Sequence, residues 1–367
     1  ECFFSMKYKG RGDLFEGLSI WSDDKYRNLQ GTCPVISLTF ADVKSGTCDG
    51  AIARIKQNLT DLYNQNEFLL KGDLLNAKER EQYDAVRPDM KNEEAEVAVR
   101  ALMGYLSRYY GKKVIVLLDE YDTPLQEAYA NGFWEEMSMF IRSMFHSMFK
   151  TNPYLERAML TGITRVSKES IFSDLNNLQV VTTTSCIYEN AFGFTEDEVF
   201  AALKEAGILD RQEQVKAWYD GFTFGKSRDI YNPWSITKYL DEKRFAAYWA
   251  NTSSNNLVSN LIREGASDVK IAMEDLIEGK SIEKVIDEEI IFEQLDDNSE
   301  AIWSLLLAAG YLKVEDVTDA DNGEDAVYRL SLTNLEVRKE FRKMVQGWFK
   351  KASIRYHDFV EALLAND

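Results

Sequence analysis

The chain has 367 residues, of which 45% are hydrophobic and 12% aromatic, which is enough to fill the cores of two or three domains. Its formal net charge is −18, and direct binding of this chain to DNA or RNA is not expected, because phosphate contacts need clustered Lys and Arg. No apolar run reaches the ~20 residues that a membrane-spanning helix needs, and no signal peptide opens the sequence, so we expect a cytoplasmic protein without membrane contact.

The first half of the chain alternates between strand and helix patterns. The predicted elements are a strand within 31–42, a helix capped by Asn92 that runs to about Tyr110 and is closed by Gly111, a strand at 113–118, a helix at about 133–150, and strands at 158–163 and 177–185. Because such alternation implies parallel crossovers, we predict an α/β fold whose parallel sheet carries helices on both faces.

The second half of the chain is mainly helical and ends in a different pattern. Helices are predicted near 194–207, 213–222, 233–242 and 268–277. The tail predicts a helix at 300–309, a hairpin formed by 311–317 and 326–332, and a last helix capped by Asn334, which is the order of a small winged-helix-like module. We therefore predict three parts: an α/β core at 1–194, a helical subdomain at 195–288 and the winged-helix-like module at 289–367.

The tip of the predicted hairpin is acidic. It carries Asp316, Asp319, Asp321, Glu324 and Asp325, which nucleic-acid phosphates would repel. We therefore expect a structural or protein-binding role for this module.

The four cysteines do not suggest a metal site. Cys2, Cys33, Cys48 and Cys186 show no C-x-x-C spacing, and the chain has only two histidines. Structural zinc sites need four closely grouped Cys or His ligands, so we interpret these residues as buried or incidental thiols.

Acidic residues follow the most hydrophobic strand, in KKVIVLLDEYDTP at 112–124. Ligands of parallel sheets bind beyond the carboxyl ends of the strands, where Asp119 and Glu120 are expected to lie. In phosphoryl-transfer ATPases an Asp at this place holds Mg²⁺, usually through water, and the next residue, Glu, orients and deprotonates the attacking water. We expect these roles for Asp119 and Glu120. The alternative interpretation is that the acids only cap the following helix.

The end of the neighbouring strand is also polar. Thr161 or Thr164 is expected to contact the same water, and Arg165 to neutralise developing charge, as an arginine finger or sensor would. The expected site therefore consists of Asp119, Glu120, Thr161 and Arg165, with Mg²⁺ and ATP as its ligands.

The sequence contains no phosphate loop of the form G-x-x-x-x-G-K-[ST]. The nearest string is GFTFGKS at 221–227, which has three residues between its glycines instead of four and follows a predicted helix rather than a strand. We reject it and expect Lys226 to be a surface lysine in a turn. Binding of ATP and Mg²⁺ is thus expected only when a phosphate loop outside these residues is present.

Six phrases occur in order along residues 112–253. They are LLDEYDTPL, LTGITRVSKESIFSDLNNL, FGFTEDEV, WYDGFTFG, YNPWSITKYL and YWANTS. Together they resemble the bacterial AAA-ATPase-like proteins, a group of P-loop NTPases often joined to a C-terminal PD-(D/E)xK nuclease-like domain. The resemblance implies a P-loop NTPase-like core at 1–194, with Asp119 and Glu120 as the second nucleotide motif (Walker B). It also implies that this sequence begins after the basic phosphate loop and ends before the nuclease-like domain.

Three functions agree with these observations. The first is an ATP-binding and ATP-hydrolysing switch that is deficient in nucleotide binding without its phosphate loop. The second is a non-catalytic interaction scaffold derived from an ATPase. The third is the control half of an ATP-regulated nuclease, although strings resembling E-x-K occur by chance, and one of them, EFRK at 340–343, falls in a predicted helix. The second function would use an aromatic set that we expect mainly in the core: Trp218, Tyr219, Tyr231, Trp234, Tyr248 and Trp249.

Overall fold

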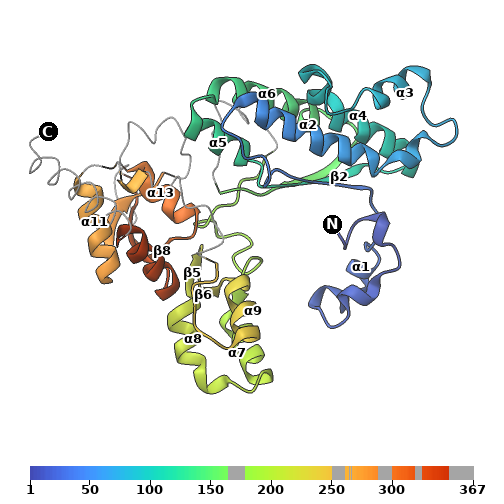
Figure 1. The fold of residues 1–367 in the computed structure, drawn as a ribbon. Helices are drawn as coiled ribbons and strands as arrows, with labels where there is room; N and C mark the ends of the chain where they lie inside the picture. Colours follow the sequence, from blue (N-terminus) through green and yellow to red (C-terminus); the bar gives the residue numbers. More distant parts are fainter. Residues whose placement is uncertain are drawn as a thin grey trace, which may run out of the picture. The chain divides into compact units, whose positions relative to one another are not determined.

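A computed structural model describes residues 1–163, 178–249, 261–263, 265, 267–287, 300–318 and 325–346 of the chain. The chain divides into two compact units, Glu1–Leu178 and Gln179–Asp367 (Figure 1). The described elements of the first unit are η1 (Met6–Tyr8), η2 (Gly12–Phe15), η3 (Ser19–Trp21), α1 (Asp24–Arg27), β1 (Val35–Thr39), α2 (Cys48–Asn64), η4 (Glu67–Leu70), α3 (Ala77–Asp84), α4 (Asn92–Tyr110), β2 (Val114–Asp119), α5 (Thr123–Asn131), α6 (Trp134–Phe149) and β3 (Leu155–Leu160). Those of the second unit are β4 (Phe194–Thr195), α7 (Glu196–Glu205), η5 (Leu209–Arg211), α8 (Gln212–Tyr219), β5 (Asp220–Phe224), β6 (Ser227–Tyr231), α9 (Pro233–Glu242), α11 (Ser267–Glu278), β7 (Ile282–Val285), α13 (Ala301–Ala308), β8 (Leu312–Thr318), β9 (Val327–Leu332) and a helix at 335–346.

The first unit is built on a three-stranded parallel sheet with the order β1-β2-β3. Strand β2 lies in the centre, with Thr39 of β1 opposite Asp119 and Leu160 of β3 opposite Leu118. Helical segments connect β1 to β2 and β2 to β3, as parallel neighbours require. The predicted mixed α/β class and the parallel sheet are therefore confirmed.

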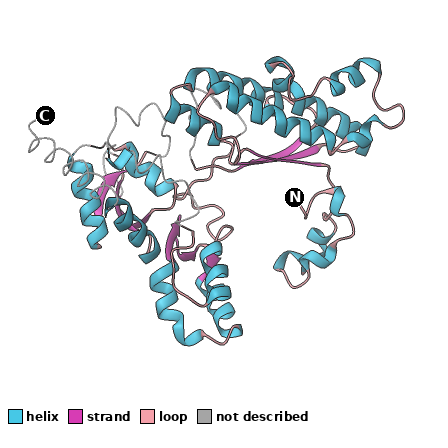
Figure 2. Cartoon of the chain, in the orientation of Figure 1, coloured by secondary structure: helices cyan, strands magenta, loops and turns pink. Residues whose placement is uncertain are grey.

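Helices cover one face of this sheet. Ile36 and Val116 lie on that face and are 1% and 0% exposed, and Figures 1 and 2 show α2, α4, α5 and α6 gathered on this side. Ser37 and Met159 lie on the opposite face, where Ser37 is exposed and Met159 is 47% exposed. Within the described part of the unit, the expectation of helices on both faces is therefore not met.

Helix α4 follows from its sequence almost as predicted. Val99 and Leu102 of its apolar stripe are fully buried, whereas Tyr109 near its end is 50% exposed, and Gly111 ends the helix with φ of +64°. Asn92 is the first residue of the helix, and Lys91 occupies the N-cap position. The Lys91 backbone N–H donates to the Glu94 carboxylate at 2.8 Å. The predicted cap was thus one residue late.

Two predicted strands need correction. Strand β3 covers Leu155–Leu160 rather than 158–163, so Thr161 directly follows it. Residues 178–185 form no strand, although Val and Thr favour one. There the Ser185 hydroxyl accepts from the Thr182 N–H at 2.9 Å, and the Ser185 N–H donates to the Thr182 carbonyl at 3.2 Å. Such local bonds close a turn and compete with strand pairing. Residue 177 lies outside the described residues.

The first half of the second unit combines helices with a small antiparallel sheet in the order β4-β6-β5. The region 195–288, predicted as helical, therefore contains strands as well. Most of the aromatic set lies in or against the core, and Trp234 is its one exposed member, at 50%. The buried core residues here are Val199, Leu203, Val215, Tyr219, Tyr231, Ile236 and Tyr239.

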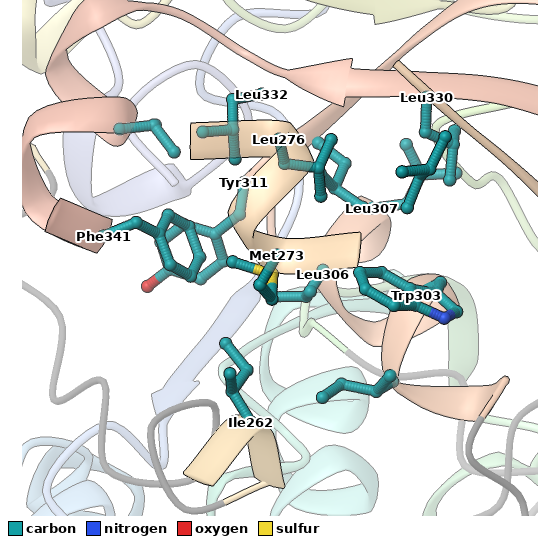
Figure 3. Packing of buried hydrophobic residues seen from close by; sticks show 14 of the residues in the cluster. Ile262, Met273, Leu276, Trp303, Leu306, Leu307, Tyr311, Leu330, Leu332 and Phe341 are labelled. Carbon is teal, nitrogen blue, oxygen red and sulfur yellow. The ribbon is translucent and has the colours of Figure 1, made fainter. Parts of the chain in front are cut away.

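The tail shows the predicted helix, hairpin and helix as α13, β8–β9 and 335–346. A third strand that the sequence did not predict, β7, pairs with β9 and gives the sheet order β7-β9-β8. Helix α13 is buried all round, since residues 301–307 are at most 5% exposed. Figure 3 shows its Trp303, Leu306 and Leu307 in one apolar cluster with Met273 and Leu330.

Several predictions for the tail stay predictions. The winged-helix-like character of the module and the part boundaries after 194 and 288 are among them. Of the acidic hairpin tip, Asp319, Asp321 and Glu324 lie outside the described residues. The EFRK string does lie in the helix at 335–346, as expected. None of the described helices is long and apolar enough to cross a membrane.

Candidate functional site

The carboxyl edge of the parallel sheet brings three of the predicted site residues together. Strand β2 is buried along most of its length, whereas Asp119 and Glu120 at its end are exposed. The flanking strands reach the same edge, because the Phe40 N–H donates to the Asp119 carbonyl at 3.0 Å and the Tyr121 N–H donates to the Thr161 carbonyl at 3.0 Å. Asp119, Glu120 and Thr161 therefore lie where ligands of parallel sheets bind.

Asp119 and Thr161 are joined by their side chains. The Thr161 hydroxyl donates to Asp119 Oδ1 at 2.5 Å, which is the short distance typical of a bond to a charged acceptor. This bond fixes the orientation of the carboxylate. Among the described residues, Asp119 Oδ2 has no hydrogen-bond partner, so it is free to contact a cation or a water molecule.

Glu120 has an unusual backbone conformation. Its φ is +49°, in the left-handed region, which costs a residue with a Cβ about 1–2 kcal/mol. The Thr123 N–H donates to the Glu120 carbonyl at 3.1 Å, and the Thr123 hydroxyl donates to Glu120 Oε2 at 3.1 Å. Strain of this kind at the end of a buried strand is typical of functional sites. The two bonds from Thr123 fix the backbone and the exposed carboxylate of Glu120, the residue directly after Asp119.

The alternative interpretation, in which the acids cap the next helix, is not supported. Asp122 occupies the N-cap position of α5 but makes no capping bond to the backbone of that helix. Its Oδ2 instead accepts from the Ile163 N–H at 3.0 Å and from Gln126 Nε2 at 3.1 Å. No role for Asp122 was predicted from the sequence.

The donor set at this edge suits a hard cation. Carboxylate and hydroxyl oxygens from Asp119 and Thr161 are the ligand types that Mg²⁺ takes, and Mg²⁺ is usually held by one or two carboxylates together with substrate phosphates. The described residues contain no group of three or more His, Cys, Asp or Glu that could enclose a metal by themselves. A metal at this edge would thus need oxygen ligands from a substrate or from water.

The structure does not show the remaining predicted residues at this edge. Thr164 and Arg165 lie outside the described residues, so their predicted contacts stay predictions. The rejected string at 221–227 covers most of β5, the turn at 225–226 and the first residue of β6, and Lys226 is exposed in that turn, as expected. It therefore lacks the strand-to-helix setting of a phosphate loop.

A surface hollow of about 300 Å³ lies away from these residues. Its lining comes from α3, α4 and Tyr154 and includes Arg100, Tyr105 and Arg108. Tyr154 precedes β3 and its carbonyl accepts from the Val114 N–H at the start of β2. The hollow thus lies toward the amino ends of the strands, whereas Asp119 lies at their carboxyl ends.

Comparisons with known proteins agree with this geometry. Residues 1–172 match a family model described as "Predicted AAA-ATPase", a range that includes the whole parallel sheet and its acidic edge. The chain is also 27% identical over 263 residues to an uncharacterized protein in the vnfD 5′ region of Azotobacter chroococcum mcd 1, which covers 70% of the chain. The chain matches 48% of that protein and so spans about half of its length. No significant match was found among solved structures. Residues 1–172 are thus similar to the predicted AAA-ATPase family.

Proposed function

We propose that this chain carries the magnesium- and water-positioning part of an ATP site, in a protein that acts as an ATP-hydrolysing molecular switch. The observation that carries the proposal is the side-chain bond between Asp119 and Thr161 at the sheet edge, next to Glu120 in its left-handed conformation. The family match supports an ATPase-like nature for residues 1–172 at the level of the family.

Each residue has a distinct role in this proposal. Thr161 occupies Asp119 Oδ1, so Asp119 offers Oδ2 to the hydration shell of Mg²⁺. Thr123 occupies Glu120 Oε2, so Glu120 offers Oε1 to orient the attacking water and to take its proton. When bound, Mg²⁺ neutralises charge on the phosphate oxygens. Adjacent positions with different backbone conformations allow the two carboxylates to serve different partners.

The phosphates of ATP need a second set of contacts. Such contacts come from the backbone N–H groups and the lysine of a G-x-x-x-x-G-K-[ST] loop, and this string is absent from the 367 residues. We propose that a phosphate loop elsewhere in the protein completes the site. The chain alone is then expected to bind ATP weakly.

Hydrolysis kinetics of the complete protein, with its phosphate loop, test the proposal. Glu120→Gln should keep magnesium-dependent ATP binding and lower kcat by about 100-fold or more, since loss of a general base costs roughly 10²–10⁴-fold. Asp119→Ala should weaken both binding and hydrolysis.

Glu127→Gln is the matched control, because Glu127 is an acid in the second turn of α5 that takes no part in the bonds described at the acidic edge. It should hydrolyse ATP at the wild-type rate. A Glu120→Gln protein with unchanged kcat would contradict the role given to Glu120. A wild-type protein that neither binds nor hydrolyses ATP would contradict the proposed function itself.

A further inference from the structure

Asp122 is a buried carboxylate that the roles above leave unexplained. Its residue is 1% exposed, although it follows two exposed acids by only two positions. Burying a carboxylate is costly unless donors satisfy it. Its donors among the described residues include the Ile163 N–H at 3.0 Å and Gln126 Nε2 at 3.1 Å, both to Oδ2. One of these donors comes from the segment after β3, forty-one residues further along the chain.

Glycine at position 162 is what allows this approach. A Cβ on Gly162 would lie 2.5 Å from Asp122 Oδ1 and 2.8 Å from Tyr121 Cε1, which is closer than real Cβ atoms come to their neighbours. The Asp122 carboxylate therefore packs directly against the backbone that follows Thr161. The absence of a side chain at Gly162, after β3, thus leaves room for the Asp122 carboxylate, after β2.

The bonds around Thr161 form a continuous series across these two strand ends. The Thr161 N–H donates to the Leu118 carbonyl at 2.9 Å, and the Tyr121 N–H donates to the Thr161 carbonyl at 3.0 Å. The Ile163 N–H then donates to the Asp122 side chain. The Thr161 hydroxyl, which faces Asp119, lies in the middle of this series. Its position thus depends on bonds on both sides of it.

We propose that Asp122 is a positioning residue for the ATP site. It holds residues 161–163 against the turn at 119–122, so that the Thr161 hydroxyl stays on Asp119 Oδ1 and the free oxygen of Asp119 keeps its direction. This inference rests on the proposed ATPase function. It adds a residue that touches neither the nucleotide nor the metal but acts through Thr161 and Asp119.

The bond from the Ile163 N–H to Asp122 and the packing of Asp122 against Gly162, together called the Asp122 lock, predict how substitutions behave. Asp122→Ala removes the acceptor for the Ile163 N–H and leaves a gap beside Gly162. Asp122→Asn keeps the size and one acceptor oxygen for that N–H. Gly162→Ala leaves Asp122 intact but forces its carboxylate away. Small displacements of catalytic groups lower rates by up to roughly 100-fold, and they do so without removing substrate contacts.

The test uses the complete protein with its phosphate loop, measured for kcat and KM of magnesium–ATP hydrolysis and for amide hydrogen exchange in residues 161–163. Asp122→Ala and Gly162→Ala should each lower kcat at least tenfold, change KM less than threefold, and speed exchange of these amides. Asp122→Asn should stay within threefold of the wild-type kcat. Glu127→Gln serves as the control and should change neither quantity.

Three results would overturn the inference: an unchanged kcat in Asp122→Ala, an effect confined to KM, or an Asp122→Asn protein as impaired as Asp122→Ala. A wild-type protein that does not hydrolyse ATP would instead contradict the proposed function. The proposed effect of Asp122 on catalysis would then fall with it. Unchanged amide exchange in Asp122→Ala would show that Asp122 does not hold residues 161–163 in place, whatever the activity.

Discussion

Three acids within four residues have three different environments. Asp119 is exposed and bonded to Thr161, Glu120 is exposed in a left-handed conformation, and Asp122 is buried against Gly162. The sequence was sufficient to predict that Asp119, Glu120 and Thr161 lie at one edge of the sheet, because strand ends of a parallel sheet meet there. It was not sufficient for Asp122, because the contact with Gly162 joins residues forty positions apart. The available signal was Gly162, directly after the threonine that follows β3.

The strain at Glu120 leads to a prediction on stability. Glycine adopts positive φ without a steric cost, whereas alanine keeps the Cβ that makes this conformation unfavourable. Both Glu120→Gly and Glu120→Ala lose the bond from Thr123. The free energy of unfolding of Glu120→Gly should therefore exceed that of Glu120→Ala by about 1 kcal/mol. Urea titration followed by circular dichroism measures the difference. An alanine variant as stable as the glycine variant would show that Glu120 does not hold this conformation in solution.

Among the helices and strands, local sequence patterns predicted which elements exist better than they predicted where each element begins and ends. Helix α4 and strand β2 agree with prediction within one residue, since each carries a complete apolar pattern and its own end signals. The helix expected at 213–222 ends at Tyr219, and β5 begins at Asp220. Gly221 has φ of +133°, and a Cβ there would lie 1.9 Å from the Thr333 carbonyl oxygen. That close approach comes from tertiary packing, which a local pattern does not contain.

The hairpin of β5 and β6 carries a carboxyl group that makes stability depend on pH. Burial first, and then the nearby Asp229, raise the pKa of Asp220 to about 7, while Lys216 and Lys313 act in the opposite direction. A raised pKa means that the folded state favours the protonated form. The stabilising contribution of this group is therefore complete below its ordinary pKa near 4 and is lost as the pH rises through about 7.

Asp220→Asn should remove this dependence. Thermal unfolding of the wild type and the variant between pH 5 and pH 8 measures it. We expect the variant to gain in Tm relative to the wild type as the pH rises, because the amide keeps the size of the side chain without its charge. A difference in Tm that stays constant over this range would contradict a raised pKa at Asp220.

In the molecule as a whole, the described candidate site residues lie in the first of the two units. The first unit holds the acidic sheet edge, within the residues that match the model of the predicted AAA-ATPase family. The second unit is organised around apolar clusters, and its α13 is enclosed on all sides. The sequence predicted the α/β class and the helix–hairpin–helix order of the tail. The pairing of β7 with β9 brings together residues about 45 positions apart, and no short-range pattern shows it.

The central claim is that Asp119 and Glu120 belong to an ATP site that a phosphate loop completes. Titration calorimetry with ATP, with and without Mg²⁺, tests it most directly on two proteins: residues 1–367 alone, and a form extended to include a G-x-x-x-x-G-K-[ST] loop. We expect magnesium-dependent binding by the extended form, its loss in Asp119→Ala of that form, and weak or no binding by residues 1–367. Extended protein that binds no ATP, or that binds it equally well without Asp119 and without Mg²⁺, would contradict the account.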